Sequence, residues 1–232
     1  MARRNRATDN GTGTVTMLEA MRILRAAYPN PRRTILVGHW GGEEEGLIGS
    51  RAFTEDHKDV VDNLQVAFNQ DNGTWRVEYI QAQGFLLAGG SLARWVAQLP
   101  SEIGDNIKLD LPGAQETGGS DHVSFMCHGA PGFRLQSPYP EYLQYTHHTN
   151  LDTYDKVVVD DLKNNATLTA MLAFLASEDP QRVPRDRSVL PPYTQNPQRM
   201  PSLPSAPAQA PNSQTGTPRT WIACTPAQRS FK

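Results

Sequence analysis

The sequence has little of what marks several specialised classes of protein. Its 232 residues include only two cysteines, Cys127 and Cys224, too few for a disulfide framework, so we expect each to be a plain thiol. No apolar run is long enough to cross a bilayer, and the basic start MARRNRATDNGTG lacks the apolar stretch of a signal peptide. As written, the chain predicts a cytoplasmic protein without a membrane span.

The sequence also has no large excess of positive or of negative charge. The formal net charge is -2 and the pI is near 6.3, so there is no basic field for a phosphate backbone and we expect no nucleic-acid partner. Hydrophobic residues make up 38% of the chain, enough for one substantial core, and a single α/β domain is the natural expectation. Composition leaves the oligomeric state unknown.

Strand and helix patterns alternate up to about residue 177. Apolar residues at helical spacing predict helices over about 14–28, within 46–57, within 90–99 and over about 160–176. Short apolar runs predict strands within 33–39, 63–71, 75–82, 106–111 and 131–136. Strands separated by helices indicate a mostly parallel sheet covered on both faces, with ligands bound beyond the carboxyl ends of the strands.

The composition changes from about residue 178. The stretch PSLPSAPAQAPNSQTGTP contains many of the chain's 18 prolines and little that can be buried. Such a stretch does not offset the entropy lost on ordering. We therefore divide the chain into a domain, residues 1–177, and a Pro-rich, disordered C-terminal tail, residues 178–232. The apolar cluster TWIAC, residues 220–224, is the one candidate in the tail for docking on the domain.

Three consecutive carboxylates, Glu43, Glu44 and Glu45, follow the predicted strand that ends in TILVGH. In a solvated loop they would favour the start of the next helix, because acidic groups interact well with a helix N-terminus. In a metal site, a divalent cation would offset their mutual repulsion. The second interpretation requires further ligands on other loops.

Such residues follow or precede other predicted elements. Asp9 lies in the turn before the first helix, Asp71 ends a strand in FNQDNGT, and His147 and His148 lie in the loop YTHHTNLDTYDK. Each one alone is typical of a turn or of an isolated histidine. Together, at successive junctions of an α/β pattern, they favour a metal site.

Five motifs occur in an order and spacing that identify a family resemblance: TDNGTGT, GGEEEGLIGSRAF, FNQDNGT, GGSDHVSF and HHTNLDTYDK. Over about residues 7–177 the chain resembles the co-catalytic zinc exopeptidases, which include bacterial leucyl aminopeptidases, aminopeptidase Y and carboxypeptidase Q. It is most similar to the carboxypeptidase Q-like group. The resemblance implies an α/β fold, a three-layer αβα sandwich with a mostly parallel mixed sheet, and two zinc ions.

The resemblance also implies a role for each candidate residue. Asp9 resembles the aspartate that bridges the two zinc ions, and Glu43 resembles the general base. Glu44 and His148 match ligands of the first zinc, and Asp71 matches a ligand of the second.

Two other sites have weaker assignments. Ser120, Asp121 and His122, in GGSDHVSF, are implied to shape a substrate pocket or to support the metal loops. A helix-capping role for Ser120 or Asp121 is equally open. Glu45 occupies a position that the family varies, so we expect it to be solvated.

One implied ligand is missing. Family members carry a histidine, in a His-x-Asp motif, shortly before the bridging aspartate, whereas only MARRNRAT precedes Asp9 here. The second zinc would keep Asp9 and Asp71 alone, and the first would keep Asp9, Glu44 and His148. We therefore expect one firmly bound zinc, and the chain resembles a family member that lacks its N-terminal part. The resemblance suggests that the full-length form is secreted or periplasmic.

The sequence thus predicts a zinc-dependent exopeptidase that hydrolyses peptide bonds next to a free terminus, with amino-terminal removal as the first expectation. One alternative is a weakly active or inactive relic, or a binding module, that retains one zinc site. Another is a glutaminyl cyclase-like zinc enzyme on the same scaffold.

Overall fold

A computed structural model describes residues 6–113, 116, 119–188 and 221–228. The α-helices are α1 (Thr12–Ala27), α2 (Ile48–Asp56), α3 (Lys58–Asn63), α4 (Gly89–Val96), α5 (Ser101–Gly104), α6 (His122–Met126) and α7 (Val159–Glu178). The strands are β1 (Ala67–Asn69), β2 (Tyr79–Gln81), β3 (Lys108–Asp110) and β4 (Gly132–Gln136). Single turns of other helix types are η1 (Ala7–Gly11), η2 (Leu86–Ala88), η3 (Tyr142–Thr146) and η4 (Tyr154–Lys156).

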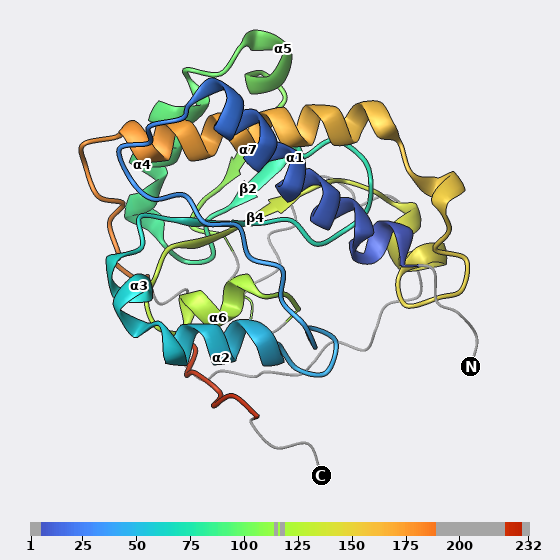
Figure 1. Cartoon of the computed structure of the whole chain (residues 1–232), viewed down its shortest axis with the longest axis horizontal. Coiled ribbons are helices and arrows are strands. Elements are labelled where there is room, and N and C mark those ends of the chain that lie inside the picture. The colour runs from blue at the N-terminus through green and yellow to red at the C-terminus, as the bar shows by residue number, and fades with distance from the viewer. Residues whose placement is uncertain (1–5, 114–115, 117–118, 189–220, 229–232) are drawn as a thin grey trace, which may run out of the picture.

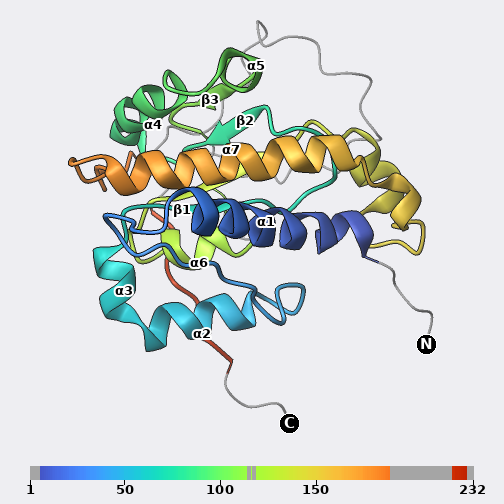
Figure 2. The same cartoon turned by 45° about the horizontal axis from the view of Figure 1, so that its top comes forward.

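The four strands form one mixed sheet in the order β1-β4-β2-β3. β1 pairs with β4 and β2 pairs with β3 in parallel, while β2 and β4 are antiparallel. Figures 1 and 2 show α1 and α7 on one side of the strands and α2, α3 and α6 on the other. The predicted α/β fold with a mostly parallel mixed sheet between helices is confirmed.

The core lies between the sheet and the helices on both sides. Leu168 and Leu172 of α7 pack with Ile80 and Phe133 of the sheet, and all four side chains are fully buried. On the other side, Phe125 of α6 belongs to a second apolar cluster with residues of α2 and α3. Burial of each large apolar side chain contributes roughly 1.5–3 kcal/mol, so these layers hold the strand ends in place.

The first helix turns a different face inward from the one its apolar spacing predicts. Val15 and Leu18 are 53% and 52% exposed, whereas Thr16, Ala20 and Leu24 are buried. These three residues recur every four positions, so they form one stripe along the helix. Ala20 and Leu24 pack against α7, and the small side chains of this stripe allow the two helices to approach closely.

The strand predicted within residues 33–39 is wrong. These residues have no regular secondary structure and pair with no strand of the described chain, and Leu36 is 62% exposed. A strand needs a neighbour for its backbone groups, and here the segment lines a cavity of about 1480 Å³ that Phe68 of β1 also lines. Its apolar sequence indicated burial, but the space beside it is open.

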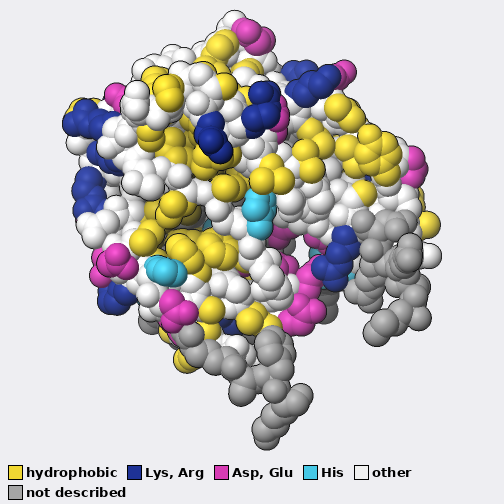
Figure 3. Space-filling view, viewed as in Figure 1, with side chains coloured by type: hydrophobic (Ala, Val, Ile, Leu, Met, Phe, Trp, Pro, Cys, Tyr) yellow, Lys and Arg dark blue, Asp and Glu magenta, His cyan; other side chains and the backbone are white. Residues whose placement is uncertain are grey.

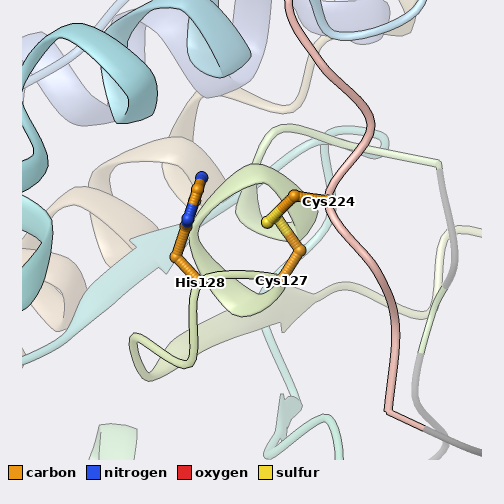
Figure 4. A group of neighbouring side chains, drawn as sticks. All are labelled: Cys127, His128 and Cys224. Carbon is orange, nitrogen blue, oxygen red and sulfur yellow. A yellow bond between two sulfur atoms is a disulfide. The ribbon is translucent and has the colours of Figure 1, made fainter.

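The expectation of two plain thiols is also wrong, because Cys127 and Cys224 form a disulfide. Figure 4 shows the bond joining the end of α6 to the C-terminal segment, with His128 beside it. The indole of Trp221 donates a hydrogen bond to the Met126 carbonyl at 3.1 Å and packs edge-on against a core phenylalanine. The sequence did not predict the bond because composition cannot place a distant segment beside α6.

Two segments of the predicted tail therefore pack on the domain. Residues 179–188 follow α7 and bury Val183, and residues 221–228 carry the disulfide and Trp221. The suggested docking of TWIAC is confirmed for residues 221–224. Residues 189–220 and 229–232 lie outside the described residues, so for them the disordered tail stays a prediction.

Candidate metal centre

Carboxylates from four separate segments converge at one end of the large cavity. Glu43 and Glu44 come from the loop before α2, Asp9 from η1, Asp71 from the end of β1, and Asp121 from the residue before α6, and all five line the cavity. Figure 3 shows acidic side chains around a hollow in this face of the molecule. Among these five residues, the structure thus brings together groups up to 112 positions apart in the sequence, the separation of Asp9 and Asp121.

Glu43 is the centre of this cluster. Burial, and then the charges of Asp71, Asp121, Glu44 and Asp9, raise the pKa of the Glu43 carboxyl to about 8. Adjacent carboxylates raise each other's pKa because two negative charges repel in a site of low polarity. A cation placed among them would stabilise the ionised carboxylates and lower the pKa of Glu43. The cluster is therefore suited to binding a cation.

The raised pKa of Glu43 predicts that the metal-free protein loses stability as the pH rises. With a folded pKa of about 8 and an ordinary value of 4.5, the folded state holds the proton more tightly, so the contribution to stability is present below about pH 4.5 and lost through about pH 8. We expect the Tm of EDTA-dialysed protein to fall from about pH 5 to about pH 8, and Glu43→Gln to reduce that fall. Thermal unfolding of both proteins across this range is the measurement, and an equal fall in both would contradict it.

The three residues implied as ligands of the first zinc lie together. His148 Nε2 is 2.8 Å from Glu44 Oε2 and 3.6 Å from Asp9 Oδ2. All three line a cavity of about 10 Å³, close to the space that one water or ion requires. Arg6 Nη1 is 3.2 Å from the other oxygen of Glu44.

Asp71 is held from two directions. Its carboxylate accepts a hydrogen bond from the Ser120 hydroxyl, which in turn accepts a hydrogen bond from Asn69 Nδ2 at 2.7 Å. Its carbonyl accepts a hydrogen bond from Arg134 Nη2 at 3.1 Å. Asp71 is 8% exposed, and this burial raises the pKa of its carboxyl. Ser120 therefore supports a predicted ligand.

The other two residues of GGSDHVSF have different surroundings. Asp121 lines the cavity, and burial raises its pKa to about 6. It precedes α6 without a side-chain capping hydrogen bond, so the helix-capping alternative is wrong for this residue. His122 is buried, with Nε2 3.3 Å from Glu116 Oε2. Burial opposes ionisation of Glu116, but the hydrogen bond from His122 and the nearby Arg134 charge together lower its pKa to about 2.

Two further groups lie beside Asp9: His147, which the sequence analysis named without assigning it a role, and Tyr142, which it missed. The ligand atoms of His147, His148 and Asp9 all lie within 4.8 Å of one another, and the two imidazoles stack at 3.7 Å. The Tyr142 hydroxyl bonds to Asp9, and burial beside these carboxylates raises its pKa. The adjacent histidines were a visible signal for His147, but an aromatic residue five positions earlier carried none.

Carboxylates and histidines gathered at the edge of a mixed α/β sheet are the arrangement of a metal-dependent hydrolase. A sequence profile of Peptidase family M28 matches residues 4–173. The chain belongs to this family of metallopeptidases.

Curated relatives and solved structures agree with this assignment. Carboxypeptidase Q of Xenopus laevis is 27% identical over 181 residues, which cover 77% of this chain and 37% of the relative. Leucine aminopeptidase 1 of Ajellomyces dermatitidis is 28% identical over 179 residues, covering 72% and 46%. The chain therefore spans less than half the length of these curated relatives.

Two solved structures share the fold. A peptidase M28 precursor from Shewanella amazonensis superposes with a TM-score of 0.60 at 24% identity, over 80% of this chain and 40% of that one. BSAP, a zinc aminopeptidase from Bacillus subtilis, gives a TM-score of 0.56 at 25% identity, over 74% and 42%. The family resemblance read from the motifs is confirmed.

Proposed function

We propose that the chain carries the catalytic centre of a zinc-dependent exopeptidase that acts as an aminopeptidase. The observation that carries the proposal is the meeting of Asp9, Glu44 and His148 around one small cavity, with Glu43 beside them. Two carboxylates and an imidazole suit a catalytic zinc, whereas structural zinc sites favour thiolates. The described helices, for their part, include none long and apolar enough to span a membrane.

In this proposal Asp9, Glu44 and His148 would hold a zinc ion, which when bound would supply a more acidic water molecule and polarise a peptide carbonyl. Glu43 takes a proton from that water and returns it to the departing amine. It is placed for this because it lines the large cavity but not the small one, and a bound cation would lower its pKa and leave the carboxylate free to accept a proton. Its neighbour Glu45 also lines the large cavity but is exposed, so we expect it to be solvated.

The charge of the cavity supports aminopeptidase action over carboxypeptidase action. Six carboxylates line it against three arginines, and one of these, Arg6, is paired with Glu44. Such a field attracts the free ammonium group of a peptide and repels its carboxylate. A glutaminyl cyclase-like enzyme would also begin from a free amino terminus, so the two are separated by product. A relic or binding module would retain zinc without turnover.

The disulfide supports the proposal that the protein works in an oxidising compartment. Disulfides such as Cys127–Cys224 persist in secreted and periplasmic proteins and are rare in the cytosol. This favours the secreted or periplasmic location that the family resemblance implies over the cytoplasmic one.

Metal content provides a direct test. Asp9, Glu44 and His148 offer a complete catalytic ligand set, while Asp71 with the shared Asp9 offers a poor one, so we expect about one zinc to remain per chain after dialysis. Elemental analysis of dialysed protein measures this. Retention of no zinc, or of two zinc ions, would contradict the ligand count.

Activity on peptides provides the test of function. Zinc-loaded protein is assayed on aminoacyl p-nitroanilides, on dipeptides and on peptides with a blocked amino terminus. We expect release of the first residue from free termini and none from blocked ones. Cyclised amino-terminal glutamine as the product would support the cyclase alternative, and zinc binding without any turnover would support the relic.

A further inference from the structure

The carboxylate of Asp152 is buried beside the metal centre, although nothing in the proposed reaction uses it. Asp152 is 2% exposed. Oδ1 accepts hydrogen bonds from the Thr8 amide and the Thr8 hydroxyl, both at 2.7 Å, and Oδ2 accepts one from the Asp9 amide at 2.9 Å. A charge buried this far is tolerated only when donors satisfy it. These three donors therefore fix where the carboxylate and its partners lie.

These bonds join two loops that carry predicted zinc ligands. Asp9 and Asp152 are 143 positions apart in the sequence. Asp152 follows His148 by four positions in the same loop, and its carbonyl also accepts a hydrogen bond from the Ala7 amide at 3.3 Å. The position of Asp152 thus sets the position of Asp9 relative to His148.

The loop that Asp152 holds is also tied to the loop of Asp71. Asn10 Nδ2 donates to the Gln70 carbonyl at 3.1 Å, and the Thr12 hydroxyl donates to the Gly73 carbonyl at 2.6 Å. These two carbonyls flank Asp71. Movement of the η1 loop would therefore displace Asp9 from His148 on one side and disturb Asp71 on the other.

We infer that Asp152 is a positioning residue for the metal centre, acting through the backbone of Thr8 and Asp9. Both of its oxygens are occupied by protein donors, so it supports a ligand without being one. The inference rests on the proposed zinc-dependent function. It assigns to Asp152 the task of holding Asp9 where Glu44 and His148 can share the same ion.

Zinc affinity tests the inference directly. Asp152→Asn keeps the volume of the side chain but turns one acceptor into an NH₂ group that faces backbone N–H donors. Outer groups that orient metal ligands usually change metal affinity by about 10- to 100-fold when they are replaced. We expect a loss of that size in zinc affinity, measured by competition with a chromophoric chelator, and a fall in kcat with KM unchanged.

Two further variants separate positioning from general stability. Asn165 is equally buried and joins the Val77 amide to the Trp75 carbonyl, apart from the ligand loops. Asn165→Ala should lower the Tm of the metal-free protein and leave zinc affinity unchanged. Thr8→Val removes one of the three donors to Asp152, so it should weaken zinc binding less than Asp152→Asn does. If Asp152→Asn does not fold, the zinc affinity of Thr8→Val tests the inference in its place.

The outcomes divide clearly. Weaker zinc binding in Asp152→Asn or Thr8→Val, but not in an equally destabilised Asn165→Ala, supports the inference. Wild-type zinc affinity in Asp152→Asn, or in Thr8→Val where only that variant folds, overturns it. A wild-type chain that binds zinc yet hydrolyses no peptide overturns the proposed exopeptidase function alone, because the zinc affinities of the variants still test the role of Asp152. A wild-type chain that binds no zinc overturns both.

Discussion

Replacing Glu43 by glutamine is expected to lower kcat on aminoacyl substrates by about 10²- to 10⁴-fold, the usual contribution of a positioned general base. Glutamine has nearly the same shape but cannot accept the proton of the attacking water. Glu43 is not among the residues that line the small cavity, so the variant should retain zinc and bind substrate with a similar KM. Steady-state kinetics and elemental analysis on the same preparation give both results.

Two neighbouring glutamates serve as controls for this prediction. Glu45→Gln changes an exposed carboxylate in the same loop and should leave kcat and zinc content unchanged. Glu44→Gln alters a residue 2.8 Å from His148 and should release zinc. Equal loss of zinc from Glu43→Gln and Glu44→Gln would show that the assignment of base and ligand is wrong.

Removing the disulfide is expected to cost about 2–5 kcal/mol of unfolding free energy. Cys127 and Cys224 are 97 positions apart, and a crosslink that closes so long a loop strongly restricts the unfolded chain. It also keeps Trp221 against the core, where the indole contacts Phe85 and bonds to Met126. The double variant Cys127→Ser/Cys224→Ser tests this in urea unfolding experiments.

The reductant response of the wild type completes the test. Reduced wild-type protein should unfold at the urea concentration of the double variant, and the double variant itself should not respond to reductant. Because Trp221 lies on the anchored segment, its fluorescence should report release of that segment before or with global unfolding. A wild-type protein that unfolds identically with and without reductant would contradict the prediction.

Local patterns predicted most elements because each one obeys a short-range rule. The expected helices correspond to α1, α2, α4 and α7, and four of the five expected strands correspond to β1, β2, β3 and β4. The incorrect predictions concern which distant segments lie next to each other. Residues 33–39 have a strand-like composition, but pairing depends on what lies alongside, and here that is a cavity. Likewise, nothing near Cys224 in the sequence indicates that it meets Cys127.

In the candidate site, too, local patterns were predictable from the sequence and long-range contacts were not. Adjacent glutamates and histidines at the ends of predicted elements were visible as ligand types, and motif order supplied their roles. The residues that hold those ligands were not visible, because their contacts join distant loops. Asp152 and Arg134 have no local pattern of their own, and each becomes recognisable only when its hydrogen bonds to Asp9 or to the Asp71 carbonyl are known.

The separation of Asp9 from Asp152 also dictates when the site can come into being. A chain grows at roughly 5–20 residues per second, so Asp9 would be synthesised roughly 7–29 s before its partner, 143 positions later. Until then neither Asp152 nor His148 exists, and the Asp9 amide lacks its carboxylate partner. Under the proposed function, zinc uptake would therefore follow synthesis of residues 148–152, and a bound ion would show that the loops of Asp9 and Asp152 have met.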